Sequence, residues 1–240
     1  MKHVCRIIQI LLITLAIKPP LAAQPGNEQL VFDLRFGIIK GGEAVYTVKD
    51  TIVNNQHALY AFLRGNTTGV TDLIYAVNDQ YSSLLHKESF LPMWSTKKLS
   101  EQKFRFNEQI TYNQQHGEII SNHLGKKEVA QNICDLSALM YHFRFSGQIN
   151  RLEEDEVLHI PFWDTNEWYY LDIKYAGKEQ IKTKLGKFNC LRFEPQHVSG
   201  RFFNRKNPMN IWITNDARRL PVLMELNFTI GSVKCELIDT

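Results

Sequence analysis

The pattern that most restricts the fold is the alternation of apolar and polar side chains along most of the chain. Between Glu43 and Val53, for example, Ala44, Tyr46 and Val48 occupy every second position. Residues two apart in a strand point to the same face of a sheet, so this spacing is typical of a strand with one buried face. The pattern predicts a mainly β chain of antiparallel strands joined by short turns.

Glycines lie between many of the alternating segments, and we expect turns at Gly41-Gly42, Gly177 and Gly186. No Pro/Ser-rich linker and no internal repeat interrupts the series. The expected strands are 30–39, 43–53, 57–68, 79–90, 94–99, 102–107, 109–113, 118–122, 157–163, 167–174, 179–185, 188–195, 210–214, 220–228 and 232–238. We therefore expect residues 24–240 to form a single β-rich domain, a curved antiparallel sheet with one inserted helix.

The inserted helix is expected at about residues 133–145, where the apolar spacing becomes helical. Asp135 is the expected N-cap, because its carboxylate can accept hydrogen bonds from the first turn. The apolar positions follow i, i+3, i+4 and i+7 and are Leu136, Leu139, Met140 and Phe143. Residues 69–75 are expected to form a turn and a short helix.

A second, polar stripe of this helix offers the best candidate site. It contains Ser137, Tyr141 and Arg144. Tyr141 and Arg144 could face a cavity and bind an anionic group, since a guanidinium matches a carboxylate or phosphate. Alternatively, Arg144 could pair with a buried carboxylate and lock the helix to the sheet, and we favour this structural role. Asp216 is a candidate for that carboxylate.

Residues near the C-terminus present the same choice between ligand binding and structure. Trp212 and Arg219 join Tyr141 and Arg144 as candidate ligand-binding residues. Asp216, like Asp135, is a candidate structural polar residue, because Asn215-Asp216 is typical turn chemistry.

The N-terminus resembles a secretory signal peptide. Lys2 and Arg6 precede an apolar run at residues 7–17, and small residues follow it up to Ala23. That run is shorter than the ~20 residues of a membrane-spanning helix. We expect cleavage of residues 1–23, export to the periplasm or outer envelope of a Gram-negative-type bacterium, and no transmembrane segment in the mature chain.

Removal of the signal changes the charge of the protein. The whole chain has 28 basic and 25 acidic residues. Lys2, Arg6 and Lys18 lie in the signal and no acidic residue does, so the mature chain is formally neutral. A neutral chain lacks the electrostatic signature of a nucleic-acid-binding protein, and we expect no nucleic-acid partner.

Three cysteines remain after residue 23, namely Cys134, Cys190 and Cys235. Cys190 and Cys235 lie in strand-like runs and could form a disulfide in an oxidising compartment. Cys134 is expected to be a small buried residue.

Motifs for catalysis are missing from the sequence. It has no Gly-x-Ser-x-Gly elbow, no phosphate-binding glycine loop and no His-Glu-x-x-His helix. The nearest histidines, His116 and His123, do not have the spacing of metal ligands. We therefore expect no catalytic residue, no metal and no cofactor.

Several segments occur together and in order, and together they resemble a known family. They are residues 36–44, Leu91-Pro92, residues 135–144, residues 185–188 and residues 211–221. As a set they look like the bacterial exported family called domain of unknown function 3108. Met140 is an extra residue relative to the pattern of that family. The resemblance covers residues 30 to 237 and implies a β-roll or half-open barrel packed on a helix, somewhat like lipoprotein carriers, with no established activity.

The function that we expect is non-enzymatic binding of a lipid, a lipidated molecule or an envelope polysaccharide in a groove of the curved sheet, with the helix at 133–145 as its cap. One alternative is a structural or interaction module that contacts an envelope protein. A second alternative is a polysaccharide hydrolase, which would need two convergent carboxylates with one raised pKa.

Overall fold

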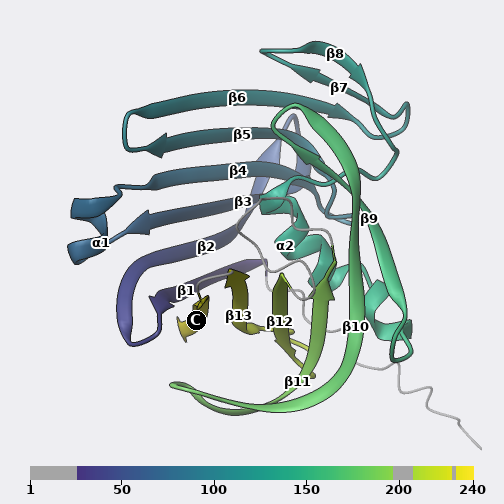
Figure 1. Cartoon of the computed structure of the whole chain (residues 1–240). Helices are drawn as coiled ribbons and strands as arrows, with labels where there is room; N and C mark the ends of the chain where they lie inside the picture. The colour runs from purple at the N-terminus through teal and green to yellow at the C-terminus, as the bar shows by residue number, and fades with distance from the viewer. Residues whose placement is uncertain (1–25, 197–207, 229–230) are drawn as a thin grey trace, which may run out of the picture.

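The computed structural model describes residues 26–196, 208–228 and 231–240, and the predicted signal peptide lies outside this part. The described residues form one 14-stranded antiparallel sheet in the order β8-β7-β6-β5-β4-β3-β2-β1-β14-β13-β12-β11-β10-β9 (Figure 1). The strands are β1 (Asn27–Phe36), β2 (Ile39–Val53), β3 (Gln56–Thr67), β4 (Asn78–His86), β5 (Pro92–Glu101), β6 (Phe104–Asn113), β7 (Glu118–Ser121), β8 (Gly125–Glu128), β9 (Val157–Asp164), β10 (Glu167–Thr183), β11 (Gly186–Pro195), β12 (Met209–Thr214), β13 (Pro221–Phe228) and β14 (Gly231–Asp239). The mainly β prediction is confirmed.

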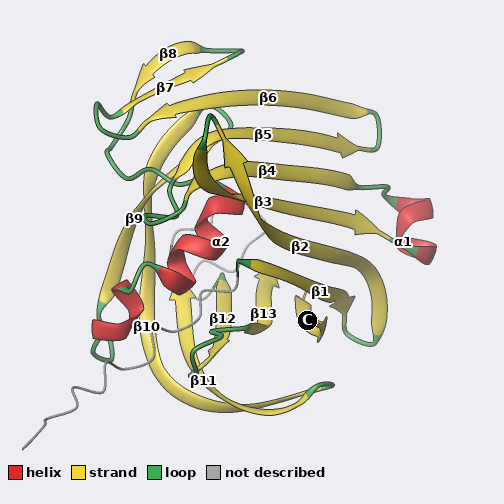
Figure 2. Ribbon diagram, turned by 180° about the vertical axis from the view of Figure 1, so that it is seen from behind, coloured by secondary structure: helices red, strands yellow, loops and turns green. Residues whose placement is uncertain are grey.

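The first and last strands of the chain join the two halves of the sheet. β1 pairs with β2 on one side and with β14 on the other, and both pairs are antiparallel. The edges are therefore β8 and β9. Because the sheet curves strongly, these edges turn towards each other around its concave side (Figures 1 and 2). The result is the half-open barrel that we expected.

A short segment before the central helix connects the two sides of the opening. The Val129 amide donates to the Gly117 carbonyl at 2.8 Å, beside β7. Five residues later, the Cys134 amide donates to the Pro161 carbonyl of β9, and the Trp163 amide donates back to Cys134, each at 2.8 Å. The segment 129–134 thus provides hydrogen-bond partners for some of the backbone groups on the edge of β9.

The helix α2 (Leu136–Phe145) follows this segment and lies inside the curve of the sheet (Figure 2). Asp135 is its N-cap, as predicted, and accepts a hydrogen bond from the Ala138 amide at 2.9 Å. Two smaller helices lie elsewhere, α1 (Gly69–Ile74) after β3 and a 3-10 turn at Gln148–Arg151.

The burial of α2 differs from the expectation that its polar stripe faces a site. Ser137, Tyr141 and Arg144 are almost completely buried, whereas Leu136 and Leu139 are only partly buried. The helix fills one end of the barrel, and its start, at Leu136 and Ser137, borders a cavity. Its polar groups are buried because partners in the sheet satisfy them; the Tyr46 hydroxyl of β2, for instance, donates to the Ser137 carbonyl at 2.9 Å.

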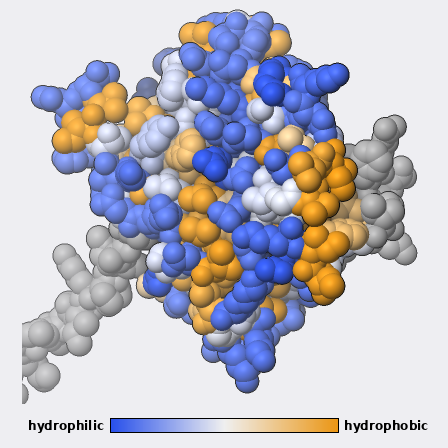
Figure 3. All heavy atoms as spheres, turned by 90° about the vertical axis from the view of Figure 1, so that its left-hand side faces the viewer, coloured by the Kyte–Doolittle hydropathy of each residue, from blue (hydrophilic) through white to orange (hydrophobic). Residues whose placement is uncertain are grey.

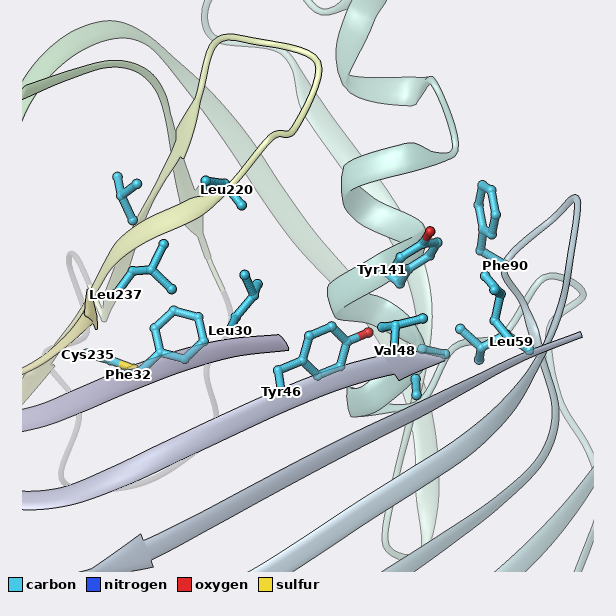
Figure 4. Packing of buried hydrophobic residues seen from close by; sticks show 14 of the residues in the cluster. Leu30, Phe32, Tyr46, Val48, Leu59, Phe90, Tyr141, Leu220, Cys235 and Leu237 are labelled. Carbon is cyan, nitrogen blue, oxygen red and sulfur yellow. The ribbon is translucent and has the colours of Figure 1, made fainter. Parts of the chain in front are cut away.

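Around α2 the core is well packed (Figure 4). Tyr46 and Val48 of β2 and Leu59 of β3 extend towards the helix, and Tyr141 packs edge-on against Phe90 with ring centroids 5.1 Å apart. Edge-to-face pairs of this kind are worth about 0.5–1.5 kcal/mol beyond their buried area.

Two expected turns and one expected division between strands are wrong. Gly41 and Gly42 lie inside β2, and the turn is at Gly37, whose φ is +58°. Gly177 lies inside the 17-residue β10, where the register shifts between Tyr175 and Lys178. A glycine at such a bulge bends a strand without ending it. The two strands expected at 102–113 are the single strand β6.

The disulfide considered between Cys190 and Cys235 is not present, since both thiols are free and buried. In the sheet, β12 and β13 lie between β11 with Cys190 and β14 with Cys235. Three strand spacings of about 4.8 Å exceed the ~7 Å limit on the Cα–Cα distance of a disulfide. Cys134 is buried, as expected.

Candidate functional site

Arg144 has the structural role that we favoured, but with another partner. Its Nη1 and Nη2 donate to the two carboxylate oxygens of Glu28 at 2.6 and 3.0 Å. The Nε donates to the Arg219 carbonyl at 2.8 Å, and Nη2 also reaches the Arg218 carbonyl at 3.1 Å. Arg144 therefore ties α2 to β1 and to the turn before β13.

Asp216 is not the partner of Arg144, so that prediction is wrong. Its Oδ1 accepts hydrogen bonds from the Thr214 hydroxyl at 2.8 Å and from the Arg218 and Arg219 amides at 3.0 and 3.1 Å. These are the bonds of a side chain that closes its own turn, because a short carboxylate accepts readily from amides two and three residues ahead. Asp216 positions the turn whose carbonyls hold Arg144.

The other candidate ligand-binding residues also have partners within the fold. Tyr141 is buried between Phe90 and Phe145. The Trp212 indole donates to Glu179 of β10 at 2.9 Å. The Arg219 side chain donates to Asn150, and burial lowers its pKa. Tyr141, Arg144, Trp212 and Arg219 line neither of the two cavities described below. Their role in binding a ligand stays a prediction.

Asp135 forms the centre of a buried polar network. Besides the Ala138 amide, its carboxylate accepts from the Ser83 hydroxyl at 2.7 Å, from Ser137 at 3.1 Å and from Tyr112 at 3.2 Å. Burial raises the pKa of this carboxyl, although the four donors lower it. The network joins the start of α2 to β4 and β6, and three of its members, Tyr112, Asp135 and Ser137, also line the polar cavity described below.

The concave side of the sheet is hollow at the end near α1. An apolar cavity of about 520 Å³ lies between the ends of β1 to β4 and β14. Its apolar lining includes Leu34, Phe36, Ala44, Leu63 and Val233. Its volume falls within the ~300–1,000 Å³ of small-molecule sites, which are mostly apolar with a few polar groups.

Small residues explain why this end is hollow. Gly42 and Ala44 of β2 and Gly65 of β3 line the cavity and have little or no side chain to fill it. A Cβ atom added at Gly65 would meet nothing within 4 Å, so the space beside it is free. Gly42 differs, because its added Cβ would lie 2.7 Å from the Asn66 carbonyl oxygen. Gly42 is therefore needed for strand packing, whereas Gly65 leaves room.

A second, polar cavity of about 420 Å³ lies between β4 to β6, the start of α2 and β9. Lys97 donates to Asp164 across it at 2.7 Å, and Glu108 accepts from the Ser121 hydroxyl at 3.0 Å. Tyr81 lines both cavities, and burial raises the pKa of its hydroxyl. The two cavities are thus neighbours, one apolar and one with charged groups.

Our sequence reasoning missed both cavities because it followed large polar side chains. A signal was present, since Ala44 and Gly65 occupy positions of expected strands where large apolar residues would fill a core, and Gly42 directly precedes the first of these strands. Register pairs Ala44 directly with Gly65, which brings the small residues together. The turn at residues 54–55 sets that pairing, and the expected strands 43–53 and 57–68 left room for it, so the signal could have been found by pairing these two strands.

Comparison with solved structures supports the fold. A crystal structure described as a β-barrel-like protein of domain of unknown function DUF1849 from Brucella abortus matches with a TM-score of 0.59. The match covers 89% of this chain and 96% of that chain at 10% sequence identity, so it bears on the fold alone. No curated protein matches the chain. Among the described residues, no helix has the length and apolar character needed to cross a membrane.

The family model described as protein of unknown function DUF3108 matches residues 31–238. This range includes the described strands except the first residues of β1 and the last residue of β14, together with α1 and α2. The chain therefore belongs to the DUF3108 family, as its sequence motifs indicate.

Proposed function

We propose that this protein is an exported, non-enzymatic protein of the periplasm or cell envelope that binds an amphiphilic molecule, a lipid or a lipidated compound, inside its half-open barrel. The observation that carries the proposal is the apolar cavity of about 520 Å³ beside Gly65. A hydrocarbon chain that leaves water for such a cavity gains about 0.8 kcal/mol per buried CH₂ group.

The neighbouring polar cavity suits the other end of such a molecule. Tyr81 lies between the two cavities, and beyond it Lys97, Asp164 and Glu108 present charged and hydrogen-bonding groups. A ligand with an apolar chain and a polar head could therefore lie along the concave side of β3 to β6. An envelope polysaccharide fits the apolar cavity less well, because sugar hydroxyls would lose their hydrogen bonds to water there.

The first experiment fills the cavity. A fluorescent fatty acid that brightens in apolar surroundings would be titrated into the mature protein and into the variant Gly65→Leu. We expect the variant to bind at least tenfold more weakly, because the leucine side chain would occupy the free space next to Leu63 and Ala44. Gly65 does not have a positive φ, so the backbone accepts the substitution.

The matched control is Arg64→Leu. Arg64 precedes Gly65 on β3, is exposed, and points to the opposite face of the sheet because successive side chains alternate. We expect the Arg64→Leu variant to bind the fatty acid with the same affinity as the wild type. Equal binding by wild type and Gly65→Leu, with both proteins folded by circular dichroism, would contradict binding in this cavity.

A further inference from the structure

Apolar side chains are exposed around the opening of the apolar cavity. The β1–β2 turn presents Ile38, which is 93% exposed, and α1 presents Leu73, which is 87% exposed. The full set in these two segments, which we call the apolar rim, is Phe36, Ile38, Ile39, Val70, Leu73, Ile74 and Tyr75. Figure 3 views the molecule from the side on which α1 lies in Figure 1, and apolar side chains, in orange, interrupt the hydrophilic surface there.

α1 is unusual because it buries none of its residues. An isolated helix of six residues is not stable in water, so the surrounding structure must hold it. The Thr68 amide before it donates to the Gly41 carbonyl at 3.0 Å, and the Thr67 hydroxyl donates to Asp72 at 2.8 Å. The exposed side chains of α1 therefore have a fixed position, although no part of the described chain covers them.

The turn at Ile38 is held in a similar way. The Arg35 guanidinium donates to the Ile38 carbonyl at 3.4 Å and pairs with Asp33 at 3.0 Å. Gly37 supplies the positive φ that the tight turn requires. The start of β2 links the two segments, because an added Cβ on Gly41, four residues after Gly37, would lie 3.1 Å from the Thr71 hydroxyl of α1.

The apolar rim is continuous with the apolar cavity. Phe36 and Ile39 are exposed members of the rim and also line the cavity, and Thr71 of α1 lines it as well. A hydrocarbon chain that enters the cavity from this side passes these side chains. Asp72 is the single charged residue in 36–39 and 69–75, so the rim itself attracts neither an acidic nor a basic partner strongly.

We propose that the apolar rim is a membrane-docking surface that inserts into the outer part of a lipid bilayer and places the cavity opening against the lipid chains. The proposal rests on the proposed function, because a bilayer is the source of the ligand that the cavity suits. The exposed and mostly uncharged side chains of the rim suit the interface of a bilayer, where an apolar face buries about 5–10 Å deep. A bilayer fits the rim because Phe36, Ile39 and Thr71 also line the cavity, so lipid that covers the rim lies at the cavity opening.

The test is flotation with lipid vesicles. The mature protein would be mixed with vesicles of phosphatidylcholine and phosphatidylglycerol and centrifuged in a density gradient. We expect the wild type to float with the vesicles at both low and high salt, since insertion is apolar. The partition coefficient of the double variant Ile38→Ser/Leu73→Ser into the vesicles should be at least tenfold lower, because the free energy gained by burying these two apolar side chains in lipid is lost. Both residues are exposed, so the variant should fold normally.

The matched control is Ile52→Ser/Ile120→Ser, which removes two exposed isoleucines elsewhere. Ile52 and Ile120 are 63% and 59% exposed and lie at the far end of β2 and on β7. This control should float like the wild type. Equal loss in both double variants, or no flotation of the wild type, would overturn the proposal. So would a dimer of the wild type that the rim variant abolishes, because a second copy would then cover the rim.

Failure of docking can be separated from failure of ligand binding. Ile38 and Leu73 do not line the cavity, so the rim variant should bind the fluorescent fatty acid normally in solution without vesicles. Gly65→Leu should show the reverse, with normal flotation and weak binding of the fatty acid. If the rim variant and Gly65→Leu lose the same activities together, the rim has no separate docking role and the proposal is wrong.

Discussion

The two ends of the barrel interior differ in what fills them. At one end α2 occupies the space, and buried hydrogen bonds connect it to β1, β2, β4 and β6. At the other end small residues line an apolar cavity, and the adjacent α1 buries none of its residues. Both ends belong to the same strands, since β2 and β3 run from one to the other. The comparison indicates that the filled end stabilises the fold, whereas the hollow end holds the cavity in which we propose that a ligand binds.

The filled end and the polar cavity also differ in how their polar side chains are paired. Arg144 and Asp135 were the most conspicuous residues of the helix in the sequence, and each has buried partners in the sheet. Buried charged and polar groups are costly unless they are paired, so such complete networks are expected inside a packed core. Polar residues of the neighbouring polar cavity, such as Lys97, pair nearer the surface instead.

Removing a charge should have the largest effect at the filled end. Arg144→Met leaves the Glu28 carboxylate buried without its partner, and we expect a loss of about 3–5 kcal/mol in the free energy of unfolding. Lys97→Met breaks the pair with Asp164, whose side chain is 45% exposed, and should cost at most ~1 kcal/mol. Denaturant unfolding of the two variants measures both values. Similar losses would contradict the distinction between the buried pair of the filled end and the partly exposed pair of the polar cavity.

A pair of leucines on one strand provides the next comparison. Leu59 and Leu63 point to the same face of β3; Leu59 is buried in the packed core, and Leu63 lines the cavity. Leu59→Ala should lower the free energy of unfolding by about 2–5 kcal/mol, because the core cannot collapse around the lost atoms. Leu63→Ala should cost less than half as much, since its side chain already borders free space. An equal cost would indicate that the cavity end is as tightly packed as the core.

The smallest expected effect is a pH dependence at the filled end. His142 of α2 contacts the Ser89 carbonyl at 2.8 Å, and burial lowers its pKa below the usual 6.5. The unfolded chain therefore binds a proton more readily than the folded one as the pH falls through 6.5. The stability of the wild type should then fall, relative to His142→Gln, between pH 8 and pH 5. The free energy of unfolding of both proteins would be measured at pH 8 and pH 5. The same difference between wild type and His142→Gln at both pH values would show that the pKa of His142 is equal in the folded and unfolded states.

Much of the fold could be predicted because it depends on local patterns. Alternation located most strands, and the helical spacing with Asp135 as N-cap located α2. The misplaced turns at Gly41-Gly42 and Gly177 have a physical cause, because glycine permits a bend or a bulge in a strand as readily as a turn. Only the neighbouring strands decide between these outcomes, and a single sequence does not show them.

The candidate site was harder to predict than the fold. Sequence reasoning placed Tyr141 and Arg144 at the centre, because a polar stripe on a helix is a visible feature. The partner of Arg144, Glu28, is 116 residues away, and nothing local distinguishes it from other acidic residues. A cavity arises where side chains are small, as at Gly65, so it depends on pairing between strands and not on any conspicuous residue.

Native mass spectrometry of the mature protein, purified gently from its native cells, tests the central claim most directly. We predict the mass of a chain that starts at Gln24 with one lipid-like molecule bound near stoichiometrically, and loss of that molecule in Gly65→Leu but not in Arg64→Leu. Extraction would then identify the ligand. A mass without ligand, unchanged after incubation with envelope lipids, would contradict the proposed binding function.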